Sequence, residues 1–329
     1  MNMKQSKTKK TAFHKNGTFL GVINADALVA LQDLPSNTFH AVVTSPPYFW
    51  ARDYGDDDQI GHEDSPEEYV ESLIKIFNEV KRVLHPEGVF YLNIGDTYYS
   101  GNGQPHGRDP RSPSRNFMRK KFRAVDKPGW DIPKKSLIGI PWMVAFAMQK
   151  QGWTLRSDII WNRINAFVEP TARDRPYRQY EHIFLFSKNR FYSYDRSALG
   201  AEEDVWTISI KRGNEIDHSA AFPKELVKKC LLTGSPPCGY VLDPFLGSGT
   251  TLNVALELGR HAIGIELNAK YAQEVERFLI RQRCNKVAWT VLENTLCETP
   301  DSWKTWKGNR ANFRKPGIGK ALQTSFLEE

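Results

Sequence analysis

Two clusters of residues near the ends of predicted strands have the types and spacing to carry chemistry. The first, Asp-Pro-Phe-Leu-Gly-Ser-Gly-Thr-Thr at positions 243–251, stands between an apolar run and a helical pattern. Glycines at such a junction let a ligand approach backbone N–H groups at a helix N-terminus. A third glycine and a Gly-Lys-Ser/Thr sequence are both absent, which disfavours dinucleotides and nucleoside triphosphates.

An acidic residue lies at a suitable distance from this glycine cluster. Glu266 follows Phe245 by 21 positions and ends the next predicted strand, where a carboxylate can accept both hydroxyls of a ribose. The pair of features therefore predicts a site for a nucleoside without phosphates. The alternative is that Gly247 and Gly249 only form a tight turn between strand and helix.

The second cluster is Thr44-Ser45-Pro46-Pro47-Tyr48, which also follows a predicted strand. Two prolines stiffen the backbone and remove N–H donors, so that carbonyl oxygens remain as acceptors beside an aromatic ring. Such an edge can hold the amino group of a flat heterocycle. An ordinary turn at the end of a strand is the alternative.

Alternating strands and helices must position both clusters. Residues 40–45 and 89–95 are short β-branched runs typical of buried strands, and between them Ser65 and Pro66 begin a helix. Strand, helix, strand is the parallel crossover unit. The alternation continues and predicts a doubly wound α/β sheet, with strands at 154–161, 181–186, 240–245 and 261–266 and helices at 140–149, 223–232, 250–258 and 269–282.

Composition excludes several classes of protein. The four cysteines among 329 residues include no Cys-x-x-Cys pair, so neither a disulfide framework nor a zinc cage is expected. The histidine spacings also give no sign of a metal site. No apolar run approaches the roughly 18 residues of a membrane span, and no signal peptide follows the first lysines. These patterns predict a cytoplasmic protein that binds no metal.

Positive charge is concentrated in one window. The chain carries 45 Lys and Arg against 38 Asp and Glu, a net charge of +7. Residues 97–136 have ten basic and three acidic side chains and no clear periodicity. Such a concentration suits a polyanion such as DNA, although a solvated loop is an equally good interpretation of charge alone.

The two clusters, in this order along the chain, resemble the β class of amino DNA methyltransferases that use S-adenosylmethionine. The resemblance covers residues 18–282 and is supported by segments 24–28, 93–97, 158–162, 181–188 and 218–223. It implies a doubly wound, Rossmann-like methyltransferase sheet, mostly parallel with one antiparallel strand, plus a basic insertion. By this resemblance, Ser45, Pro46, Pro47 and Tyr48 are catalytic, and the cofactor is held by Asp26, Asp243, Phe245, Gly247, Gly249, Thr250, Glu266, Phe222 and Pro223.

The resemblance also indicates the target base. Enzymes of this family that act on adenine N6 usually have Asp or Asn where this chain has Ser45, and Ser is typical of those acting on cytosine N4. The following loop, residues 49–55, is similar to that of the cytosine group. Cytosine N4 is therefore favoured over adenine N6. The basic window favours DNA over a protein glutamine side chain as the substrate, and the presence of both clusters argues against a non-catalytic DNA-binding role. Cys238, in a Pro-Cys dipeptide similar to that of cytosine C5 enzymes, occurs in the wrong order to serve as a nucleophile.

Three regions and one macromolecular partner are expected. Residues 1–17 are interpreted as a basic flexible arm, 18–284 as the catalytic domain with 97–136 as its DNA-recognition insertion, and 285–329 as an extension of unknown structure. Only residues 189–217 remain for a separate recognition domain, which is short. Double-stranded DNA is the expected partner; a cognate restriction endonuclease and the choice between monomer and homodimer stay open. The predicted DNA contacts are Arg52, Arg108, Arg111, Arg115, Arg119, Lys120, Lys121 and Arg123.

Overall fold

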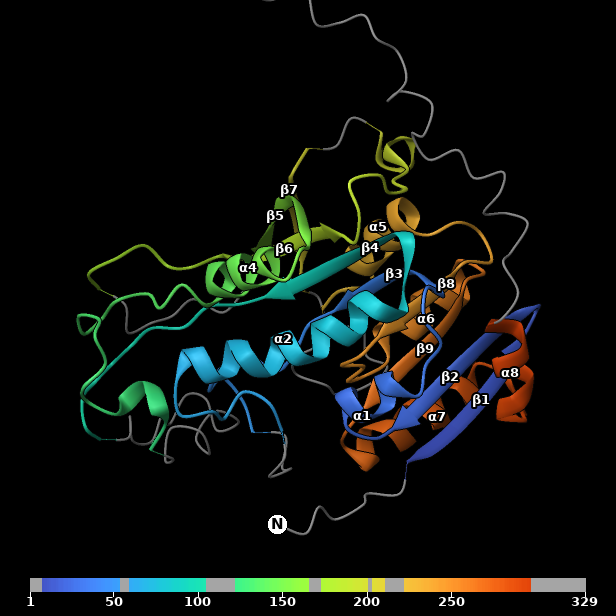
Figure 1. Ribbon diagram of the computed structural model, residues 1–329, viewed down its shortest axis with the longest axis horizontal. Helices are drawn as coiled ribbons and strands as arrows, with labels where there is room; N and C mark the ends of the chain where they lie inside the picture. The colour runs from blue at the N-terminus through green and yellow to red at the C-terminus, as the bar shows by residue number, and fades with distance from the viewer. Residues whose placement is uncertain are drawn as a thin grey trace, which may run out of the picture.

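A computed structural model describes residues 8–53, 59–104, 122–165, 173–200, 203–210 and 222–296, which form one sheet with helices on both faces (Figure 1). The strands are β1 (Lys9–Lys15), β2 (Thr18–Asn24), β3 (Phe39–Thr44), β4 (Leu84–Ile94), β5 (Thr154–Ile164), β6 (Tyr180–Ser187), β7 (Val205–Ser209), β8 (Tyr240–Asp243), β9 (His261–Glu266) and β10 (Asn285–Val287). The helices are α1 (Ala27–Gln32), α2 (Pro66–Val83), α4 (Ile140–Lys150), α5 (Lys224–Gly234), α6 (Thr250–Glu257), α7 (Ala269–Arg281) and α8 (Trp289–Leu296), with short 3₁₀ turns η2 (Ala124–Asp126) and η3 (Arg196–Leu199).

The sheet is doubly wound, as predicted. Its strand order is β10-β1-β2-β9-β8-β3-β4-β6-β5-β7, and neighbours from β2 to β4 are all parallel. Strands β3 and β8 are adjacent. After β3 the chain continues to β4 on one side of this pair, and after β8 it continues to β9 on the other side. Such a switch point is where open α/β sheets bind ligands, beyond the carboxyl ends of the strands.

Two hydrophobic layers enclose this sheet. Helices α1, α2, α4 and α8 contribute to one buried cluster, and α5, α6 and α7 contribute to the other. Helix α2, which crosses one face in Figure 1, shows how the sequence specifies such packing. The Ser65 side chain accepts from Glu68 N at its start, and Tyr69, Leu73 and Phe77 recur at helical spacing and are fully buried.

The antiparallel part of the sheet is larger than the single strand expected. Strand β6 is antiparallel to β4 and β5, as the fold prediction requires, and β1 is antiparallel to β2 and β10. The interpretation of residues 1–17 as a flexible arm is therefore wrong for Lys9–Lys15. Ala12 and Phe13 are fully buried, and Lys9 forms an ion pair with Glu276 of α7 at 2.8 Å.

The carboxyl-terminal extension also begins inside the fold. Strand β10 pairs with β1, and α8 buries Leu292 against the same layer as α1 and α2. Residues 297–329, including Cys297, lie outside the described residues. Within the ranges described, no helix combines the length and hydropathy needed to cross a membrane.

Candidate active site

The carboxyl ends of β2, β9, β8, β3 and β4 bring the two predicted clusters to one edge of the sheet. Asn24 and Glu266 are register partners at the ends of β2 and β9, and Asn24 Nδ2 donates to the Glu266 carbonyl at 2.8 Å. Strand β8 ends at Asp243 and β3 ends at Thr44. The glycine cluster and the Ser-Pro-Pro-Tyr cluster therefore meet at the switch point.

Asp243 joins the two clusters directly. Its Oδ1 accepts from Thr44 Oγ1 at 2.6 Å and from Phe245 N at 3.1 Å, and its Oδ2 accepts from Thr251 Oγ1 at 2.6 Å. Burial raises the pKa of this carboxyl to about 6, and the three donors oppose that rise. Asp243 is only 1% exposed, and these bonds tie the end of β3 to the start of α6.

The loop between β8 and α6 depends on glycine at several positions. Gly247 and Gly249 have φ of 54° and 83°, a region that favours glycine. A Cβ at Gly249 would lie 3.0 Å from both methyl groups of Val275, and a Cβ at Gly264 of β9 would lie 2.5 Å from Leu246. The loop is thus pressed closely against β9 and α7.

Glu266 lies where this loop turns. Its Oε2 accepts from Gly247 N and its Oε1 from Asn268 N, each at 2.8 Å. Burial, together with nearby Asp243, raises the pKa of Glu266 to about 7 although both N–H groups oppose the rise. Each carboxylate oxygen can accept a second hydrogen bond. A half-buried carboxylate at the end of β9, beside glycines with no side chain, fits the ribose of a nucleoside cofactor.

The structure places the other predicted cofactor residues at the starts of α1, α5 and α6 and in the loop that follows β8. Asp26 caps α1 by accepting from Val29 N at 3.0 Å, and it follows Asn24 by two positions. Thr250 is the first residue of α6, and Phe245 is partly buried against the core. Pro223 caps α5 beside Phe222, which packs on the other hydrophobic layer, while residues 218–221 are outside the described part.

Cofactor affinity is expected to depend on pH through Glu266. If the ionised carboxylate accepts both ribose hydroxyls, as predicted, binding competes with protonation below the pKa of about 7. We expect the calorimetric affinity for S-adenosylmethionine to fall about tenfold between pH 8 and pH 6. In Glu266→Gln the affinity should be weaker and should change much less with pH, with the remaining change coming from Asp243, whose pKa is about 6. Equal pH slopes in both proteins would contradict the assignment of Glu266.

The Ser-Pro-Pro-Tyr cluster is held from both sides. Tyr69 of α2 donates its hydroxyl to the Pro47 carbonyl at 2.8 Å, and no described residue donates to the Pro46 carbonyl. The ring of Tyr48 packs on Gly95, where a Cβ would lie 2.5 Å from Tyr48 Cε2. The partly exposed Ser45 and the buried Pro46 therefore lie at the edge where the Tyr48 ring packs.

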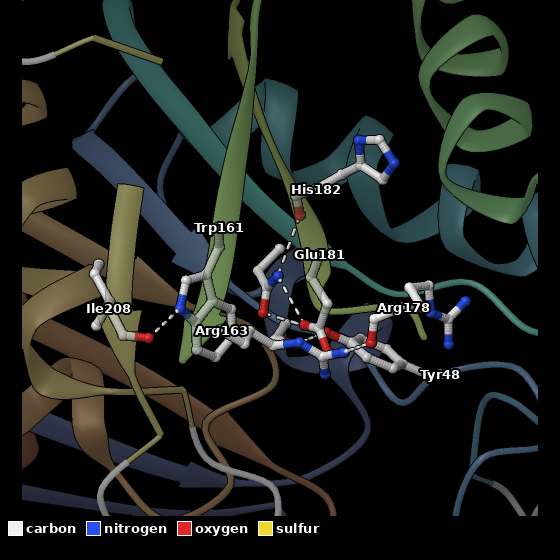
Figure 2. A network of polar contacts seen from close by, with 9 residues as sticks. Tyr48, Trp161, Arg163, Arg178, Glu181, His182 and Ile208 are labelled. Atoms are coloured by element: carbon white, nitrogen blue, oxygen red, sulfur yellow. Dashed lines mark hydrogen bonds and ion pairs between the residues drawn. The ribbon is translucent and has the colours of Figure 1, made fainter. Parts of the chain in front are cut away.

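A polar network that the sequence did not reveal fixes the Tyr48 hydroxyl. Tyr48 Oη donates to Glu181 Oε2 at 2.6 Å, and Arg163 Nη1 donates to Glu181 Oε1 at 2.6 Å. Figure 2 shows these three side chains pointing toward one another at the ends of β5 and β6. Burial and the Glu181 carboxylate both raise the pKa of Tyr48, so its hydroxyl stays protonated.

The structure describes two of the eight predicted DNA contacts. Arg52 accepts a hydrogen bond from Gln59 Nε2 through its carbonyl at 3.1 Å. Its guanidinium lowers the pKa of Tyr271 in α7, which burial and Glu266 raise. Arg123 is bound to Asp126 through Nε at 2.9 Å and Nη2 at 3.0 Å. Its side chain is only 17% exposed and holds Asp126 within the insertion, so the structure gives Arg123 a structural role, and its contact with DNA stays a prediction. Arg108, Arg111, Arg115, Arg119, Lys120 and Lys121 lie outside the described residues.

Loss of Arg123 is expected to loosen the insertion and not to change the salt dependence of DNA binding. Asp126 is fully buried, and Gly103 N donates to its carbonyl. Removing one partner of a buried pair costs about 3–5 kcal/mol. Arg123→Gln should therefore reduce hydrogen-exchange protection at residues 99–103, whereas Lys127→Gln, which breaks an exposed pair with Asp64, should leave it unchanged. A reduced salt slope in Arg123→Gln with normal protection would favour the DNA contact over the structural role.

Cys238 is on the wrong side of the sheet for catalysis. It is exposed, has a positive φ of 56°, and precedes β8, so that it lies at the amino end of that strand. Ser45 follows the carboxyl end of the adjacent parallel strand β3. A thiolate at Cys238 therefore cannot attack a base held at Tyr48.

Comparisons with known proteins agree with this geometry. A family profile described as DNA methylase, for N6 and N4 methyltransferases, matches residues 39–277. The type II methyltransferase M.SmaI of Serratia marcescens is 42% identical over 273 residues, covering 80% of this chain and 91% of its own. The type II methyltransferase M.Cfr9I of Citrobacter freundii is 43% identical over 265 residues, which cover 78% of this chain and 85% of its own.

Solved structures share the fold. The cytosine-N4-specific PvuII DNA methyltransferase aligns with a TM-score of 0.62 at 20% identity, over 84% of this chain and 91% of its own. A putative DNA modification methylase of Thermus thermophilus, complexed with S-adenosyl-L-methionine, aligns with a TM-score of 0.55 at 25% identity, over 79% and 93%. The cofactor named for that relative is the one predicted from the sequence. The chain belongs to the N6/N4 DNA methylase family and is a DNA methyltransferase.

Proposed function

We propose that this enzyme transfers the methyl group of S-adenosylmethionine to the exocyclic N4 of a cytosine rotated out of double-stranded DNA. One observation carries the proposal. The acceptor edge formed by Ser45 and Pro46 at the end of β3 is tied through Thr44 and Asp243 to the glycine loop that adjoins Glu266. The target amine and the nucleoside cofactor are thereby given adjacent sites.

The residues at the ends of β2, β8 and β9 would hold the cofactor. Glu266 would accept the ribose hydroxyls, and Gly247 and Gly249 would allow close approach to the loop backbone. Asp26, Phe222 and Pro223 are the further candidates that the family resemblance supplies. When bound, S-adenosylmethionine supplies an electrophilic methyl group on a sulfonium.

The catalytic cluster supplies position and hydrogen-bond acceptors. A stacked base hides its amino group, so the nucleotide must rotate into the pocket, at a cost of a few kcal/mol. Ser45 Oγ and the Pro46 carbonyl would accept the two amino hydrogens, which localises the nitrogen lone pair for in-line attack on the methyl carbon. As the N–C bond forms, the bond between the methyl group and sulfur would break and its electron pair would stay on sulfur. The same acceptors would stabilise the positive charge that passes to the nitrogen, which then gives up one amino proton to solvent.

The choice of cytosine rests on Ser45. A hydroxyl stands where family members acting on adenine N6 usually have Asp or Asn, and the structural neighbour from the PvuII system is named as cytosine-N4-specific. Adenine N6 is the second candidate because its amine has the same conjugated geometry. Since the relatives are named as type II methyltransferases, we include a cognate restriction endonuclease in the proposal.

One experiment identifies the base and the atom. Mixed-sequence duplex DNA is incubated with the enzyme and methyl-labelled S-adenosylmethionine, digested to nucleosides and analysed by mass spectrometry. Label in N4-methylcytosine is the expected result. Label in N6-methyladenine would replace the proposal by its alternative, and label in 5-methylcytosine would overturn the amino mechanism.

A further inference from the structure

A chain of hydrogen bonds runs from Ser45 to a carboxylate on the antiparallel strand. Ser45 Oγ lies 3.2 Å from Tyr48 Oη, which lies 2.6 Å from Glu181 Oε2. The register of β4 and β6 pairs Ile94 with His182, so Gly95 and Glu181 come next at the edge where Tyr48 packs. The sheet itself therefore delivers Glu181 to the catalytic tyrosine.

Other donors hold the Glu181 carboxylate in a fixed place. Arg163 Nη1 donates to Oε1 at 2.6 Å, and Asn93 Nδ2 donates to Oε2 at 3.2 Å and to the His182 carbonyl at 3.1 Å. The side chains of Arg163 and Glu181 are only 19% and 12% exposed. In such a site a charge-assisted hydrogen bond is short and strong.

The carboxylate fixes the direction of every bond in this chain. An ionised carboxylate has no hydrogen to donate, so it can only accept. The single Tyr48 hydroxyl hydrogen goes to Glu181, which is nearer and charged, rather than to Asn93 Oδ1 at 3.2 Å. The Tyr48 oxygen is then an acceptor for the Ser45 hydrogen, and the Ser45 lone pairs remain for another donor.

We infer that Glu181, held by Arg163, is a positioning residue that makes Ser45 a hydrogen-bond acceptor toward the target amine. This inference rests on the proposed function. A serine hydroxyl left to itself can either donate or accept. Donation to the amino nitrogen would occupy the lone pair that must attack the methyl carbon, and acceptance from the amine leaves that lone pair available.

Glu181→Gln tests the inference because glutamine has an amide that can donate. Its NH₂ group can donate to Tyr48, which then donates to Ser45 and reverses the chain. We expect the single-turnover rate of methyl transfer at saturating DNA and cofactor to fall about 10–100-fold. The affinities for S-adenosylmethionine and DNA should stay within about twofold. Glu181→Asp, which can only accept, should recover part of the rate.

A double variant separates orientation from a merely structural role. Tyr48→Phe cuts the chain, so adding Glu181→Gln to it should lower the rate little further. The matched control is Glu276→Gln, which removes a carboxylate from an ion pair with Lys9 far along α7 and should leave the rate unchanged. The inference would be overturned if the rate of the double variant fell by the product of the two single-variant reductions. It would also be overturned if the rate of Glu181→Gln equalled that of the wild type. Absence of methyl transfer by the wild type would instead overturn the proposed function and this inference with it.

Discussion

Gly249→Val is expected to abolish measurable binding of S-adenosylmethionine. Gly249 caps α6 with φ of 83°, where a β-branched residue is strained by about 1–3 kcal/mol. The new side chain would also meet the buried Val275, whose methyl groups lie 3.0 Å from the Cβ position. The loop must move to relieve the backbone strain and the contact with Val275. This movement would also displace Gly247 N, which donates to Glu266. Titration calorimetry measures the loss of affinity, which we expect to be about a hundredfold or more.

Gly259→Val provides a matched control for backbone strain. Gly259 follows the other end of α6, has φ of 65°, and has no atom within 4 Å of a Cβ position. Urea denaturation should show a loss of free energy of unfolding in both variants because of the positive φ, and a larger loss in Gly249→Val because its side chain also meets Val275. Cofactor affinity should fall only in Gly249→Val. Equal affinities in the two variants would show that the loop does not form the cofactor site.

The predicted elements that proved correct are those with strong local signals. The strand ending in Thr44, the capped helix α2 and the strand–glycine–helix unit around Asp243 each combine an apolar period with a stop or start residue. Strand β1 was missed because lysines flank its buried Ala12 and Phe13. Asn16 and Gly17, both with positive φ, form the turn to β2. An Asn-Gly pair between two short apolar runs is the sequence signal of a hairpin and could have indicated β1.

Some residues of the candidate site could likewise be predicted from the local sequence, and others depend on contacts between distant parts of the chain. The positions of Ser45, Tyr48 and Glu266 at one edge of the sheet could be predicted, because each lies at or just after the end of a strand in the local sequence. Glu181 was seen only as part of a strand motif, since its contact with Tyr48 spans 133 positions and depends on the register of β4 with β6. Asp243 was expected to face the cofactor. Its local motif could not show that Thr44 and Thr251 already use its oxygens.

The hydrogen bonds of Asp243 couple the Ser-Pro-Pro-Tyr cluster to the glycine loop. Thr44 and Ser45 are adjacent residues, and Thr44 is bound to the carboxylate that also holds the start of α6. A displacement of the glycine loop is therefore transmitted through Asp243 to the catalytic cluster. Variants within the cluster itself, beyond Thr44, are expected to affect the amine without disturbing the cofactor.

Ser45→Ala is the variant that tests this separation most directly. Loss of one preorganised hydrogen-bonding group at a developing charge typically lowers the rate of the chemical step by about 10²–10³-fold. The Ser45 side chain contacts Tyr48 and takes no part in the bonds around Asp243 or Glu266. We therefore expect single-turnover methyl transfer to fall by that factor, with calorimetric cofactor affinity unchanged within about twofold.

Cys238→Ser is the counterpart of Ser45→Ala, because Cys238 is the side chain that the sequence analysis compared with the nucleophile of cytosine C5 enzymes. Cys238 is exposed at the amino end of β8, opposite the edge that carries Ser45. Its replacement should leave the transfer rate at the wild-type value. If the rate instead fell in Cys238→Ser and held in Ser45→Ala, attack by a thiolate on the ring would replace the amino mechanism. If cofactor affinity fell in Ser45→Ala, the catalytic cluster and the cofactor loop could not be acting as separate parts of the site.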